Sequence, residues 1–218
     1  MKQYNETLLI KHTNSYNKEL LKAIKHLKKN DKILAKVVER VGKCTLKPQN
    51  NSFQSIVDAI ISQQLSMTAA TAIFNRLVEY FRPKKFPSPE DILRTSEDDL
   101  RKIGISKAKI TCLKDLSTKI INKEIHLDNF KDLSDEQIIK ELTQVKGIGI
   151  WTAHMFLIFS LGRMNVLPTE DLGIRKGIQR LYKLKKLPDR NKIEQISEEK
   201  NWSPYNSIAS WYIWRSLE

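Results

Sequence analysis

Two glycines separated by a single residue interrupt a helical pattern at Gly147-Ile148-Gly149. The apolar positions before them and the run that follows predict two helices, so the Gly-x-Gly segment is the turn between them. A turn without side chains lets a charged backbone approach closely, and the first N–H groups of the second helix then point at a phosphate. We therefore expect a phosphate-binding hairpin with Ile148 in its core and four residues facing the nucleic-acid backbone: Gly147, Gly149, Ile150 and Thr152. An ordinary tight turn between two helices is the alternative.

A second group that could do chemistry is the pair of adjacent acids Glu170-Asp171, which follows Pro168. A carboxylate could stabilise positive charge or take a proton from water. The residues alone leave a plainer interpretation open, because acids are also favoured at a helix N-terminus by the helix dipole. Trp151 and Trp214 offer electron-rich faces for a cationic base, and packing in the core is the alternative for both.

Five segments, in this order, resemble the helix-hairpin-helix DNA glycosylases of the HhH-GPD superfamily. They are Asn51–Leu65, Ile103–Ser106 with Lys109, Val145–Ala153, Val166–Ile174 and Trp202–Arg215. Within the superfamily the segments are most similar to the 3-methyladenine DNA glycosylase II group, which acts on alkylated purines. The resemblance runs from about residue 51 to the end of the chain.

The resemblance implies an enzyme that flips a damaged base out of the duplex and breaks its N-glycosidic bond. The family's catalytic aspartate corresponds to Asp171, with Glu170 as its rival. Trp151 occupies the position where strand-nicking relatives carry a nucleophilic lysine, and an indole cannot form a Schiff base. We therefore expect a monofunctional glycosylase that uses water and leaves an abasic site. The base pocket is expected to contain Trp151, Trp214, Met155 and Glu170.

The resemblance also implies a plug that fills the gap left by the flipped base. Its candidates are Gln63, Gln64 and Leu65, and Gln64 matches the family position best. Backbone carbonyls of Val145 and Ile148 could hold a Na⁺ or K⁺ ion, as hairpins of this family often do. No cofactor is expected to be required. The two cysteines, Cys44 and Cys112, cannot supply the four-cysteine iron–sulfur site of some relatives.

Helix signals dominate the rest of the chain. Ser88-Pro89-Glu90-Asp91 and Ser134-Asp135-Glu136-Gln137 predict capped helix starts, and the helical run 53–81 is expected to break near Ser62–Ser66. The fold class is all-α, with two helical lobes and a cleft between them. We expect one lobe over 52–165, ending in the hairpin, and a second that combines 1–51 with 166–218 and carries the catalytic loop.

Composition limits the function further. The 218 residues include 38 Lys and Arg against 25 Asp and Glu, a net charge of +13, and residues 1–48 alone carry 12 bases and 4 acids. Such a surplus favours a polyanionic partner, either nucleic acid or an acidic membrane, and a solvated lysine face is the plainer alternative. The family resemblance implies double-stranded DNA with damaged bases as the partner, and we expect no membrane and a monomer. No secretory signal is recognised at the N-terminus, so the expected location is the cytoplasm, at the nucleoid, in a prokaryote or the nucleus in a eukaryote.

Two other functions remain open at this point. A non-catalytic protein could use the hairpin only to clamp phosphates, and would not need a carboxylate at position 171. A glycosylase of the same fold could also act on another lesion, such as a mismatched, deaminated or oxidised base.

Overall fold

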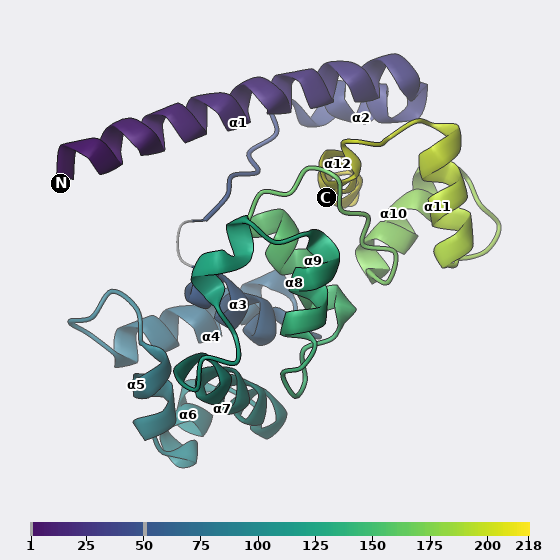
Figure 1. Cartoon of the computed structure of the whole chain (residues 1–218). Coiled ribbons are helices and arrows are strands. Elements are labelled where there is room, and N and C mark those ends of the chain that lie inside the picture. Colours follow the sequence, from purple (N-terminus) through teal and green to yellow (C-terminus); the bar gives the residue numbers. More distant parts are fainter. Residues whose placement is uncertain (1, 50–51) are drawn as a thin grey trace. The chain divides into compact units, whose positions relative to one another are not determined.

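The computed structural model describes the backbone of residues 2–49 and 52–218 and the side chains of residues 15–49 and 52–218. The described residues contain helices and loops and no strand, as the sequence predicted (Figure 1). They form two compact units: unit 1 comprises residues 1–46 with 163–218, and unit 2 comprises residues 47–162. Asn51, the first residue of the earliest family-like segment, lies outside the described residues.

Unit 2 contains seven α-helices and a short 3₁₀ helix. They are α3 (Ser52–Ser62), α4 (Met67–Tyr80), α5 (Pro89–Arg94), α6 (Glu97–Ile103), α7 (Lys107–Ile121), η1 (Leu127–Lys131), α8 (Asp135–Leu142) and α9 (Ile150–Phe159). The break expected near Ser62–Ser66 is confirmed, because α3 ends at Ser62 and α4 begins at Met67. Helix α9 is apolar on most of its surface and packs against α3 and α8 at the centre of the unit.

Serine side chains start five of these helices. A serine hydroxyl accepts the backbone N–H three residues later at the beginning of α4, α5, α6, α7 and α8. The two predicted N-cap serines, Ser88 and Ser134, are confirmed, and both form capping boxes. Each such cap contributes about 1 kcal/mol by satisfying a backbone donor that the helix leaves unpaired. Local sequence therefore determines where the elements of unit 2 begin.

Unit 1 contains α1 (Lys2–Asn30), α2 (Lys32–Val41), α10 (Leu172–Leu181), α11 (Arg190–Glu199) and α12 (Asn206–Arg215). Helix α12 is its buried core element and contacts α1, α2 and α10. Gly177 lets α10 and α12 approach closely, since a Cβ there would lie 2.4 Å from the Cγ2 of Ile213. The Tyr212 hydroxyl donates to the carbonyl of Gly42 at 2.9 Å and ties α12 to the end of α2.

A buried carboxylate joins three parts of unit 1. Asp31 separates α1 from α2 and is only 1% exposed. Its Oδ1 caps α2 by accepting the N–H groups of Ile33 and Leu34, and its Oδ2 accepts the Trp202 indole N–H at 2.8 Å and the hydroxyl of Tyr182. Burial of a charge is tolerated only when its lone pairs are satisfied, and Asp31 meets that requirement.

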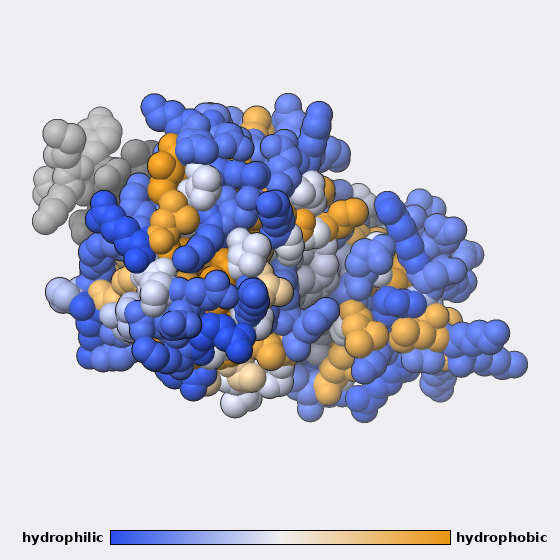
Figure 2. Space-filling model, turned by 90° about the horizontal axis from the view of Figure 1, so that it is seen from below, coloured by the Kyte–Doolittle hydropathy of each residue, from blue (hydrophilic) through white to orange (hydrophobic). Residues whose placement is uncertain are grey.

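Most of the basic surplus belongs to unit 1, which has 22 Lys and Arg against 11 Asp and Glu, whereas unit 2 has 16 against 14. On the face drawn in Figure 2, hydrophobic residues form small patches among hydrophilic ones. No helix in the described residues is both long enough and apolar enough to span a bilayer.

Candidate active site and nucleic-acid interface

Asp171 is the N-cap residue of α10 in unit 1. Its Oδ1 accepts the backbone N–H of Ile174 at 2.8 Å and the indole N–H of Trp214 at 2.8 Å. The side chain is half-buried, and its carboxylate lies at the positive end of the helix dipole. Two fixed donors from different elements therefore hold this carboxylate in one orientation. Glu170, its neighbour, is exposed.

Gly173 is required by this arrangement. A Cβ at position 173 would lie 2.9 Å from Oδ1 of Asp171 and 3.0 Å from Cδ1 of Trp214. Real Cβ atoms do not approach other heavy atoms so closely, so any side chain would displace the carboxylate or the indole. The segment Asp171-Leu172-Gly173 is thus built for close contact between its carboxylate and the tryptophan of α12.

The hairpin between α8 and α9 has the backbone that its glycines predicted. Gly147 has φ +87°, a value that favours glycine, and Ile148 is buried with its N–H donating to the Val145 carbonyl at 3.0 Å. Gly149 is the N-cap of α9 and provides no side-chain cap for the first N–H groups of that helix. Helix N-termini of this kind attract phosphate through their unpaired donors and dipole.

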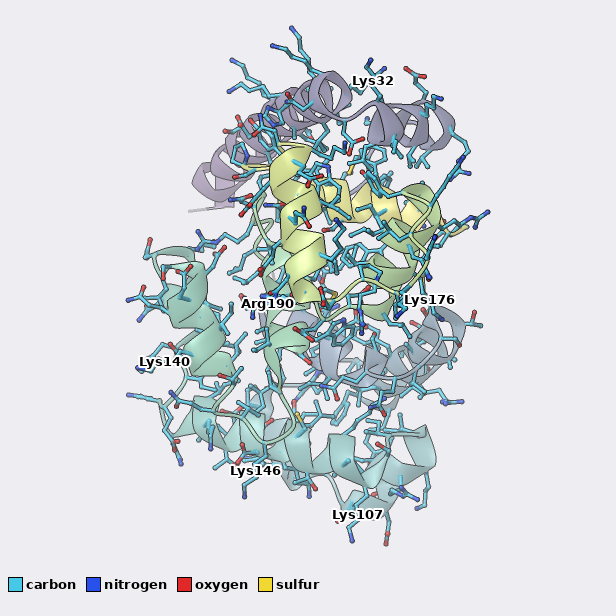
Figure 3. All side chains as sticks on the ribbon, turned by 90° about the vertical axis from the view of Figure 1, so that its right-hand side faces the viewer. Lys32, Lys107, Lys140, Lys146, Lys176 and Arg190 are labelled. Carbon is cyan, nitrogen blue, oxygen red and sulfur yellow. The ribbon has the colours of Figure 1, made fainter. Side chains whose placement is uncertain are left out.

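Helix α7 contacts the hairpin through two of its side chains, Cys112 and Asp115. The Asp115 carboxylate accepts the backbone N–H of Lys146 at 2.8 Å, and Cys112 lies directly under Gly147. Burial raises the pKa of the Cys112 thiol to about 12, so it is a packing group rather than a nucleophile. The side chains of Lys140 and Lys146, before the turn, are exposed and extend from the ribbon (Figure 3).

Residues predicted to face the nucleic-acid backbone differ in exposure. Gly147 and Gly149 are exposed, and the Ile150 side chain is 49% exposed. Thr152 is buried, and its hydroxyl oxygen accepts a hydrogen bond from the Gln63 amide at 2.9 Å. The Thr152 side chain thus points into the protein, and a phosphate contact at this residue is left to its backbone N–H.

The turn between α3 and α4 places its three predicted plug residues differently. The Gln63 amide donates to the Gly147 carbonyl at 3.0 Å and to Thr152, so it is held against the hairpin rather than directed outward. Gln64, with φ +55°, and Leu65, 40% exposed, are the members of the trio that project. Lys109 fixes the same turn by donating to the carbonyls of Ile61 and Gln63 at 2.7 and 2.8 Å.

The remaining candidate pocket residues lie on α9 in unit 2. Trp151 is half-buried in its first turn, and Met155 is buried one turn later. The carbonyl of Val145, a candidate cation ligand, accepts the Ile148 N–H but retains a second lone pair. The described side chains contain no group of three or more His, Cys, Asp or Glu residues that could bind a metal ion.

Sequence reasoning missed several contacts of this site. The Asp171–Trp214 hydrogen bond and the Gln63, Lys109 and Asp115 contacts join segments that are far apart in the chain. Lys109 was noticed only through its position in a family-like segment, and nothing indicated what its ammonium group binds.

Comparison with known proteins identifies the family of this chain. Residues 57–203 match the family model described as HhH-GPD superfamily base excision DNA repair protein. DNA-3-methyladenine glycosylase 1 of Schizosaccharomyces pombe is 36% identical over 203 residues, which cover 90% of this chain and 87% of that protein.

Two solved structures are similar over most of their length. S. pombe 3-methyladenine DNA glycosylase (Mag1) in complex with abasic DNA has a TM-score of 0.83 at 36% identity and is covered to 96%, with 89% of this chain aligned. DNA-3-methyladenine glycosidase from Bacillus halodurans has a TM-score of 0.73 at 35% identity, with 89% of this chain and 88% of that chain covered. The chain is a member of the HhH-GPD superfamily of base excision DNA repair proteins.

Proposed function

We propose that this protein is a monofunctional DNA glycosylase that removes alkylated purines, above all 3-methyladenine, from double-stranded DNA and leaves an abasic site. The observation that carries the proposal is the Asp171 carboxylate, held by the Ile174 N–H and the Trp214 indole N–H. The names of the relatives supply the substrate class, since those at 36% identity are 3-methyladenine glycosylases.

The chemistry requires one negative charge at a fixed place. Breaking the N-glycosidic bond leaves the deoxyribose with oxocarbenium-like character, and a pre-oriented carboxylate stabilises that charge without reorganising. The same carboxylate can orient a water for attack on the anomeric carbon or accept its proton. Asp171 suits the role better than Glu170, because two donors fix Asp171 whereas Glu170 is exposed.

An N-alkylated purine carries delocalised positive charge and is a good leaving group, so little acid catalysis is needed to release it. Tryptophan is the side chain that best attracts a cation to its face. Trp214, whose indole N–H donates to Asp171, is the proposed stacking partner of the flipped base. The indole at position 151 cannot form a Schiff base, which supports a water-dependent reaction without strand cleavage.

DNA binding is assigned to the hairpin and to the α3–α4 turn. The exposed glycines and the uncapped start of α9 fit a phosphate. Gln64 and Leu65 are the proposed plug that replaces the flipped nucleotide. A Na⁺ or K⁺ ion on the carbonyls of Val145 and Ile148 is compatible with the turn and would add positive charge near the phosphate, with no role in the bond cleavage itself.

The experiment is incubation of the protein with DNA treated with a methylating agent, followed by chromatography of the released bases. We expect release of 3-methyladenine, with 7-methylguanine as a second product, and strand breaks only after alkali opens the abasic sites. Strand cleavage without alkali would contradict the monofunctional assignment. If wild-type protein binds the duplex but releases no base, the protein is a non-catalytic DNA-binding protein that uses the hairpin only to bind phosphates.

A further inference from the structure

Helix α7 contacts both loops of unit 2 that are assigned to DNA. Lys109, Cys112 and Asp115 recur at intervals of three residues and so share one side of the helix. Lys109 binds the α3–α4 turn, and Cys112 and Asp115 contact the hairpin. A single rigid element therefore sets the spacing between the projecting Gln64-Leu65 pair and the phosphate-binding glycines.

Gln63 forms a second and direct link between the same loops. Its amide nitrogen donates to the Gly147 carbonyl at 3.0 Å and to the Thr152 hydroxyl at 2.9 Å, 84 and 89 positions away in the chain. Gln63 immediately precedes Gln64, which has a φ of +55° and is exposed. Any shift of the hairpin would consequently be transmitted to the base of the projecting pair.

Lys109 holds the other side of that turn. Its ammonium group donates to the carbonyl of Ile61, in the last turn of α3, where carbonyls have no partner within the helix, and to the carbonyl of Gln63, just after the helix ends. A cation also complements the negative end of the helix dipole at this place. Partial burial removes water from the Lys109 ammonium group and so lowers its pKa. The hydrogen bonds to the Ile61 and Gln63 carbonyls offset this loss of hydration.

We propose that Gln63 and Lys109 are positioning residues that hold the projecting Gln64-Leu65 pair at a fixed position relative to the hairpin. Binding of the phosphates by the hairpin and insertion of the pair into the gap left by the flipped base then occur together. The inference rests on the proposed function and deepens it. Neither residue touches the scissile bond in this assignment. Their loss is expected to slow insertion and base flipping, and to leave the cleavage of an already extrahelical base unchanged.

The test uses the full chain carrying Lys109→Met or Gln63→Met, substitutions that keep an apolar stem of similar length and remove the donors. Lys114→Met is the matched control, because Lys114 lies on α7 with similar partial exposure and the same charge, but on the opposite side of the helix. Lys109→Arg, which retains donors and charge, is the conservative variant. Thermal unfolding of all four proteins establishes which of them fold.

Single-turnover release of 7-methylguanine is measured from two duplexes, one with the lesion paired to cytosine and one with it opposite an abasic site. Unpairing removes much of the free-energy cost of flipping the base out of the duplex. We expect Lys109→Met and Gln63→Met to be slower by about 10- to 100-fold on the paired lesion and within about 3-fold of wild type on the unpaired one. Lys114→Met and Lys109→Arg should match wild type on both.

Equal losses on the two duplexes, or no loss on the paired lesion by a folded variant, would overturn the inference. If wild type releases no base from either duplex, the proposed function fails, and the fluorescence of 2-aminopurine placed beside the lesion still decides the inference. A rise on binding wild type that is absent with Gln63→Met and Lys109→Met supports it, and an equal rise with all proteins refutes it.

Discussion

Replacement of Gly173 by alanine tests whether the contact between Asp171 and Trp214 matters for catalysis. The added Cβ would lie 2.9 Å from Oδ1 of Asp171 and 3.0 and 3.1 Å from two atoms of the Trp214 indole, where ordinary contact begins at 3.4 Å. The carboxylate or the indole must therefore move by about half an ångström, and the 2.8 Å bond between them lengthens or breaks.

The effect on stability and the effect on activity should separate. Alanine in place of glycine in a helix contributes up to about 1 kcal/mol, which offsets the local clash, so we expect a melting temperature within a few degrees of wild type. Misplacement of a catalytic group by about 1 Å can cost about 100-fold in rate, so a shift of half that size predicts a loss of about 10-fold.

The assay is single-turnover release of 7-methylguanine, with duplex affinity measured separately. Gly149→Ala is the contrasting variant, because a Cβ at position 149 meets no protein atom within 4 Å but lies at the proposed phosphate site. Gly173→Ala should lower the cleavage rate at unchanged affinity, and Gly149→Ala should weaken binding at unchanged cleavage. Wild-type cleavage by Gly173→Ala would refute the proposed role of this contact.

Three further predictions concern the orientation of Asp171, the buried Asp31 carboxylate and the Gly147 turn. Trp214→Phe removes a hydrogen bond to a carboxylate, a contact that contributes about 1.5–3 kcal/mol, so we expect slower excision than in wild type, and equal rates would count against an orienting role for the indole. Asp31→Ala removes a helix cap and leaves buried donors unsatisfied; denaturant titration should show a loss above about 3 kcal/mol, and a loss under 1 kcal/mol would contradict the assignment. Gly147→Ala places a Cβ at φ +87° and 3.3 Å from Cys112, so unfolding should become easier by about 1–3 kcal/mol with duplex affinity also reduced, and an unchanged melting curve would argue against the strained turn.

Much of the fold was predictable because its signals are local. Ser88-Pro89-Glu90-Asp91 and Ser134-Asp135-Glu136-Gln137 placed the starts of α5 and α8. The Gly147–Gly149 turn and the start of α9 followed from the two glycines and the apolar runs on either side of them. Helix starts and turns depend on interactions within four or five residues, which a single sequence displays directly.

The contacts that organise the site were not predictable in this way. Asp171 and Trp214 are 43 positions apart, and Gln63 and Gly147 are 84 apart. Pairing over such distances depends on how helices pack, and no periodicity encodes it. Gln63 illustrates the difference. In the sequence, Gln63 and Gln64 are two equivalent polar residues, but in the folded protein the Gln63 amide donates to the Gly147 carbonyl and to the Thr152 hydroxyl.

The most direct measurement of the central claim compares Asp171→Asn with Glu170→Gln. Asparagine caps a helix as well as aspartate does, and its oxygen can still accept from Ile174 and Trp214, so this variant removes the charge and keeps the contacts. We predict a folded Asp171→Asn protein that binds duplex DNA like wild type and releases 3-methyladenine at least about 100-fold more slowly, with Glu170→Gln close to wild type. Undiminished release by folded Asp171→Asn would contradict the claim that this carboxylate drives base excision.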